Sequence, residues 1–344
     1  MPLPLLPAVA RWAWGRDDET ADALVCCLRD LMAAYGVLAA HRFAVGAPAV
    51  QVSVSEAGKP NSVLFKGELA VAAASSGSTR SAEAVASLVD QVRTGLRAGE
   101  IGSVDAHVEC SGLVAVGSDE EFLHNALFML GASSFADFVT VDLVTGSDVW
   151  LPFDLKGRSQ PEVYEANAPR LAALLRDLSK VLESETDADD PTYFAKPTET
   201  GAENFFDTPG SASDVWGSFE VPTRYDVFTH APGFGRIGYR RTAEGDVRYV
   251  PVLSEQGIIG HLWASDTENA ASFEPRDVGD DAIYCAGLVW LERLRSAHDR
   301  GLSPSAASAE LTAMPDEGGA GRAESDAQPQ IIDLGALRGL AADE

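Results

Sequence analysis

Cysteine and lysine are both scarce in this chain of 344 residues. Four cysteines are too few for a disulfide framework, and the neighbours Cys26 and Cys27 are poorly placed to bridge each other. Lysine occurs five times and never after Lys196. The 26 basic residues face 52 acidic ones, which gives a formal net charge of -26. Such a charge repels nucleic-acid backbones and anionic lipids, so we expect no direct binding to nucleic acid.

Long apolar runs are also missing. No window approaches the roughly 18 consecutive apolar residues that a membrane-spanning helix requires. The first seven residues are apolar but contain three prolines, and they precede Arg11 and Arg16, which is the reverse of the order in a secretory signal. We therefore expect no membrane span and a cytoplasmic location.

Alternating and helical apolar patterns are interleaved over residues 1–182, which predicts a mixed α/β domain. Ser118 to Glu121 matches a capping box and predicts a helix that continues to Leu130. The other expected helices are 20–40, 81–96 and 167–182, and the expected strands are 50–54, 63–74, 104–116 and 138–144.

Periodicity is lost over residues 183–214, which are acidic but also hold several aromatic side chains. We interpret this segment as an ordered connector that its aromatics pin to a neighbouring domain. Residues 215–313 then predict a second domain, a small antiparallel β-meander with a covering helix at 280–297. Its expected strands are 237–241, 247–253 and 258–263. The predicted fold class is α+β, with two mixed α/β units.

The end of the chain is again poor in periodic structure. Residues 314–330 are rich in Gly, Ala, Asp and Glu, which predicts a disordered linker. Residues 331–344 form a short apolar motif in which Ile331, Leu334 and Leu337 lie on one face of a helix. Residues 183–226 and 314–344 together hold much of the acidic excess. We therefore expect an electrostatic partner to bind near these two segments.

Motifs for catalysis and cofactors are weak. Residues 233–238 match G-x-G-x-x-G, but a hairpin turn follows where a dinucleotide fold needs a helix, so we interpret the match as a turn. No G-x-S-x-G sequence is present. The six histidines show no local spacing typical of a metal site. We therefore predict no catalytic residue, no metal and no cofactor.

Aromatic and arginine side chains on loops are typical of protein-binding hot spots. Two stretches have this composition, one at the end of a predicted strand and one around a Pro-Gly turn. With the tail motif, the interaction candidates are Trp150, Phe153, Arg158, Tyr225, His230, Arg236, Tyr239, Ile331, Leu334 and Leu337.

These observations favour a non-enzymatic protein-protein interaction or regulatory protein, such as an inhibitor, an immunity-type protein, an adaptor or a secretion accessory factor. An acidic surface attracts basic partners and speeds association, so the expected partner is a protein, and a basic one. Two alternatives stay open. One is a hydrolase-type enzyme with a site around Asp226, His230 and Arg236, and the other is a structural or assembly subunit. The sequence leaves the oligomeric state open.

Overall fold

The structure is a computed structural model that divides into two units, Met1–Val215 (unit 1) and Trp216–Glu344 (unit 2). Both units combine helices with antiparallel sheets, which confirms the predicted α+β class. The structure describes residues 7–18, 22–71, 78–117, 120–230, 238–255, 257–315, 319–324 and 329–343.

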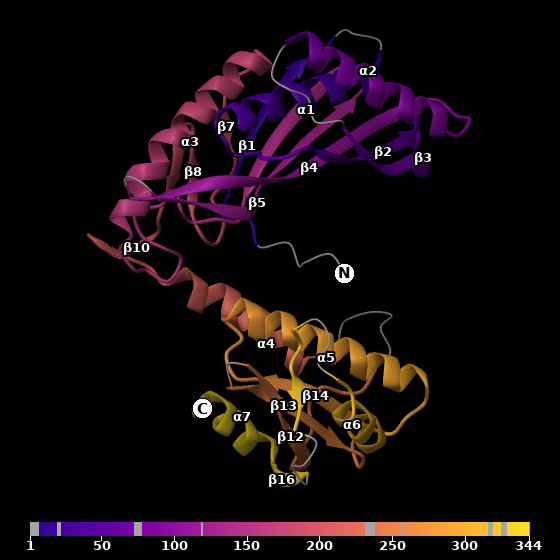
Figure 1. Ribbon diagram of the computed structural model, residues 1–344, viewed down its shortest axis with the longest axis vertical. Helices are drawn as coiled ribbons and strands as arrows, with labels where there is room; N and C mark the ends of the chain where they lie inside the picture. The colour runs from indigo at the N-terminus through magenta and orange to yellow at the C-terminus, as the bar shows by residue number, and fades with distance from the viewer. Residues whose placement is uncertain are drawn as a thin grey trace. The chain divides into compact units, whose positions relative to one another are not determined.

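Unit 1 is built on a seven-stranded sheet of order β3-β2-β4-β5-β6-β1-β7, in which all neighbours are antiparallel (Figure 1). The long hairpin β4–β5 lies near its centre. The strands are β1 (Ala10–Asp17), β2 (Ala49–Glu56), β3 (Lys59–Ala70), β4 (Ile101–Val116), β5 (Glu120–Phe135), β6 (Phe138–Thr145) and β7 (Asp187–Ala188).

Three helices cover one face of this sheet: α1 (Ala23–Ala40), α2 (Ser78–Gly95) and α3 (Pro161–Leu182). The side chain of Asp22 caps α1 by accepting a hydrogen bond from the Val25 amide. Alternation along β1 points Trp12 and Trp14 toward the helices, where they are buried. Helix α1 is long and apolar enough to cross a membrane, but more than half of it is buried and it packs on β4, β5 and β6, as a core helix does.

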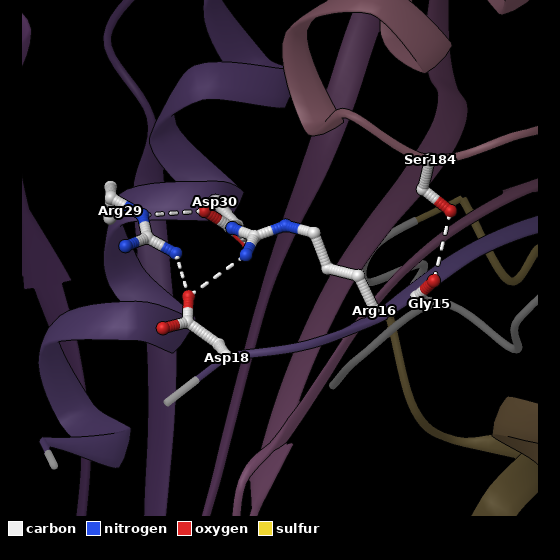
Figure 2. Close-up of polar contacts among 6 residues, drawn as sticks. All are labelled: Gly15, Arg16, Asp18, Arg29, Asp30 and Ser184. Atoms are coloured by element: carbon white, nitrogen blue, oxygen red, sulfur yellow. Dashed lines mark hydrogen bonds and ion pairs between the residues drawn. The ribbon is translucent and has the colours of Figure 1, made fainter. Parts of the chain in front are cut away.

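A closed network of charges joins β1 to α1. The guanidinium of Arg16 lies 2.7 Å from the carboxylate of Asp30 and 3.0 Å from that of Asp18. The guanidinium of Arg29 lies 2.7 Å and 2.5 Å from the same two carboxylates, so each charge has two opposite partners (Figure 2). This arrangement fixes the direction in which α1 leaves the end of the strand.

The predicted helix from Ser118 to Leu130 is wrong. Residues 118 and 119 lie outside the described residues, and the rest of the segment belongs to strand β5. Pairing with β4 along almost its whole length supplies more backbone hydrogen bonds and burial than a solvent-facing helix would. Ala126 adopts a positive φ of 50° near an irregularity in the pairing, and this break in alternation gave the sequence its helical appearance.

The segment expected to be a connector packs within unit 1. Strand β7 pairs with β1, and the indole of Trp12 donates a hydrogen bond to the Thr198 carbonyl. Phe194 is buried, whereas Tyr193 is exposed. The remaining short strands are β8 (Lys196–Thr198), β9 (Gly201–Glu203), β10 (Phe206–Thr208) and β11 (Ser211–Ala212).

Unit 2 contains an antiparallel meander of β12 (Asp246–Ser254), β13 (Gly257–Ser265) and β14 (Ala270–Pro275). Two of its strands lie where we expected them. The third is β14 and not the segment 237–241, because among the described residues there only Arg240 makes a bridge, at the edge of β14. One face is covered by α4 (Val221–Thr229), which follows a π-helical turn (Trp216–Glu220), and by α5 (Asp281–Asp299) and α6 (Pro304–Thr312).

The residues from Ile332 to Leu340 pack on the other face of this meander. Strands β15 (Arg322–Ala323) and β16 (Gln330–Asp333) both pair with β12, and helix α7 (Leu334–Asp343) follows β16 directly. Leu334 and Leu337 are buried against Tyr249 and Trp263. The tail motif therefore docks within its own chain.

The expectation of disorder over residues 314–330 is not met at the described residues 319–324. The buried indole of Trp290 donates a 2.7 Å hydrogen bond to the Ala320 carbonyl, and Ala323 is buried beside β12. These tertiary contacts outweigh a composition that on its own is typical of disordered chain.

Candidate functional site

The face of the unit 1 sheet opposite α1, α2 and α3 carries side chains that are mostly exposed or half-buried, and we call it the open face. Because neighbouring strands are in register, its side chains form rows across β4, β5, β6 and β1. Three of these rows are Glu109–Met129–Val144–Arg11, His107–Gly131–Asp142–Ala13 and Asp105–Ser133–Thr140–Gly15.

Acidic side chains predominate on the open face. Two basic side chains, Arg11 and Lys66, and the imidazole of His107 share the face with them. The seven acidic residues are Asp17, Glu68, Asp105, Glu109, Asp142, Asp187 and Asp189. Asp189 lies opposite Arg11, whose Nε is 3.6 Å from its carboxylate. The face is therefore negatively charged, and its charge comes from strands that lie far apart in the sequence.

Asp142 occupies the middle of this face. Its side chain is 26% exposed, and its nearest cation is Arg11, whose Nη2 lies 4.0 Å from Oδ2. Burial raises the pKa of the Asp142 carboxyl, against the opposing effect of the Arg11 and His107 charges. No hydrogen bond reaches this carboxylate from the described residues. By contrast, the carboxylate of Asp105 accepts a 2.9 Å hydrogen bond from the Ser133 hydroxyl.

Gly131 explains where the Asp142 carboxylate lies. A Cβ atom built on Gly131 would be 2.5 Å from Oδ1 and 3.1 Å from Oδ2 of Asp142. Both oxygens therefore occupy the space that a side chain at position 131 would fill. The missing side chain lets the carboxylate of one strand lean over the next strand of the sheet.

Two aromatic side chains lie at one end of the open face. Phe135 is 69% exposed and Phe138 is 45% exposed, and the two are paired across the β5–β6 turn. Phe138 leans over Gly15, where a Cβ atom would come within 2.8 Å of its ring. Exposed aromatic rings beside charged groups are the composition that protein interfaces favour.

The first predicted candidate stretch, residues 150–158, mostly packs inside the protein. Trp150 is buried in the core, where its ring stacks on Phe128 at a centroid distance of 5.3 Å. Phe153 is half-buried and packs edge-on against Phe206. Only Arg158 projects into solvent, and it is paired with Asp154 at 2.6 Å. Trp150 is therefore unavailable to a partner, because its indole completes the hydrophobic core.

The second predicted cluster is divided between the core and the surface of unit 2. The Tyr225 hydroxyl donates a hydrogen bond to the buried Glu274, and the buried Tyr239 donates one to the Leu302 carbonyl. His230 lies 3.3 Å from Asp226, one helical turn earlier. Their side chains are 74% and 68% exposed, so this pair is open to water. Arg236 lies outside the described residues.

The tail candidates are divided in the same way, because Leu334 and Leu337 are buried and Ile331 is 64% exposed. Among the described residues no three His, Cys, Asp or Glu side chains gather as metal ligands. No protein-family model, curated protein or solved structure matches this chain. The function must therefore be argued from the geometry alone.

Sequence reasoning missed the open face. Its signal was present in β4, where Asp105, His107 and Glu109 alternate with buried apolar residues. Alternation shows that one side of a strand is polar, but it does not show which strands lie beside it. The acidic segments singled out in the sequence contribute Asp187 and Asp189 to this face.

Proposed function

We propose that this chain is a non-enzymatic protein-binding protein whose open face receives a basic segment of a partner protein, and that it acts in the cytoplasm. The observation that supports this most is the excess of seven acidic over two basic side chains on the sheet face opposite α1, α2 and α3. Lysine or arginine side chains complement such a face and are steered toward it over a distance of about 10 Å at moderate salt.

The aromatic corner supports a protein partner over a small cation. A small cation makes no apolar contact with an exposed aromatic ring. A polypeptide, in contrast, can place an apolar side chain against Phe135 and its basic side chains over the neighbouring carboxylates. The rows of polar side chains next to that corner also suit a chain lying across the strands.

The test is the binding of a labelled synthetic peptide in which lysine alternates with threonine, measured by fluorescence anisotropy at several salt concentrations. One variant carries Asp105→Asn, Glu109→Gln and Asp142→Asn on the open face. A second, charge-matched variant carries Glu183→Gln, Glu185→Gln and Glu199→Gln, which line a separate groove beside α3.

We expect the open-face variant to bind the peptide about tenfold more weakly or worse, and the matched variant to retain most of the affinity. Equal losses in the two variants would mean that net charge alone attracts the peptide, which contradicts a dedicated face. Replacing Phe135 by Ala should also weaken peptide binding relative to wild type. The salt dependence of binding should not change, because this replacement removes apolar contact and not charge.

A further inference from the structure

The carboxylate of Asp142 differs from the other acidic groups of the open face. Its side chain is 26% exposed, whereas the other acidic residues of this face are all exposed. A half-buried carboxylate loses part of its hydration, and the 4.0 Å separation from Arg11 is too long for a hydrogen bond. The folded chain therefore holds a partly desolvated anion whose hydrogen-bonding capacity is unused within the described residues.

The surroundings of Asp142 restrict what can fill that capacity. Gly131 leaves both carboxylate oxygens over the backbone of β5, and Ala13 on the other side is too small to cover them. Both oxygens lie close to the Cβ position of Gly131, at 2.5 Å and 3.1 Å, so they lie side by side over that residue. A guanidinium presents two parallel N–H donors that match a carboxylate, whereas an ammonium is a compact point charge.

We propose that Asp142 determines the specificity of the open face by receiving an arginine side chain of the partner over Gly131. This inference rests on the proposed function, since it assumes that a basic segment binds the open face. It adds that arginine is preferred to lysine at the centre of the face, and that the position of the Asp142 carboxylate matters as well as its charge.

Three single variants separate these requirements. Asp142→Asn keeps the shape of the side chain and removes its charge. Gly131→Ala keeps the charge but places a Cβ atom where the carboxylate lies, so the carboxylate must move. Glu109→Gln removes a neighbouring exposed charge from the same face. Circular dichroism and thermal unfolding establish that each variant is folded.

The probes are two labelled synthetic peptides, in which arginine or lysine alternates with threonine. We expect the wild-type chain to bind the arginine peptide several-fold more tightly than the lysine peptide. Asp142→Asn and Gly131→Ala should each weaken the arginine peptide about tenfold and abolish the preference, and Glu109→Gln should weaken both peptides equally and slightly.

Two results would overturn the inference. If both peptides bind equally and Asp142→Asn has the same effect as Glu109→Gln, the face binds basic chains through diffuse charge. The proposed function then stands and the role of Asp142 does not. If neither peptide binds the wild-type chain in a salt-dependent manner, the proposed function fails and this inference fails with it.

Discussion

The hydroxyl of Tyr225 donates a 2.5 Å hydrogen bond to the carboxylate of Glu274, which is almost completely buried in unit 2. This contact joins α4 to β14. On the other side of the same carboxylate, Arg338 of α7 lies 3.5 Å away. One buried carboxylate therefore connects α4, β14 and α7, so Tyr225 contributes to the packing of unit 2.

Replacing Tyr225 by Phe should lower the free energy of unfolding by about 1–3 kcal/mol, because the buried carboxylate loses its neutral donor. Urea unfolding followed by circular dichroism measures the change. Tyr164→Phe is the control, since no hydrogen bond of that hydroxyl exists among the described residues. Equal stability of wild type and Tyr225→Phe would contradict the hydrogen bond seen here.

Glu274 should also make stability depend on pH. Burial raises its pKa in the folded chain, although Tyr225 and Arg338 oppose the shift. Between the unfolded and folded pKa values the native protein binds more protons than the unfolded one, so this group's contribution to stability falls as pH rises through that window. Relative to Glu274→Gln, which cannot ionise, wild type should therefore lose stability from about pH 4.5 upward, as pH-dependent urea unfolding would show. If the stability of wild type relative to Glu274→Gln instead rises with pH, the ion pair between Glu274 and Arg338 dominates.

The strands that build the open face were largely predictable, and the face itself was not. Alternation at 50–54 and 138–144 indicated β2 and β6 because one side of each strand packs on the helices. Asp105 and Asp142 come together only through the strand order β4-β5-β6, which depends on pairing between distant residues. Strand β5, the link between them, was itself expected to be a helix.

The other differences between prediction and structure concern which side chains are buried. Trp150 and Tyr239 have the composition of a binding hot spot, but both are buried in cores that the sequence alone does not show. The residue type alone does not show whether an aromatic side chain is exposed or in the core. The local sequence pattern separates the two cases only when the element is regular. Phe135 and Phe138, at a strand turn, are exposed.

The charge network between β1 and α1 should be important for stability. Asp30→Asn removes an almost buried carboxylate that holds both Arg16 and Arg29, and it should cost about 2 kcal/mol or more. Asp177→Asn, which removes a more exposed partner of Lys180 and His41, should cost about 1 kcal/mol or less. Urea unfolding of both variants at low and high salt measures the two effects. Similar costs would show that the network in Figure 2 acts as ordinary surface pairs.

The C-terminal helix offers a test of docking within the chain. Leu337 is fully buried against the meander of unit 2, whereas Ile331, on the strand before the helix, is 64% exposed. Leu337→Ala should therefore destabilise the chain by about 2–5 kcal/mol, because it leaves a cavity beside Trp263. Ile331→Ala should change the stability by no more than about 0.5 kcal/mol. Unfolding in urea at two protein concentrations separates the alternatives, since docking within one chain makes the midpoint independent of concentration, whereas docking on a second copy makes it rise with concentration.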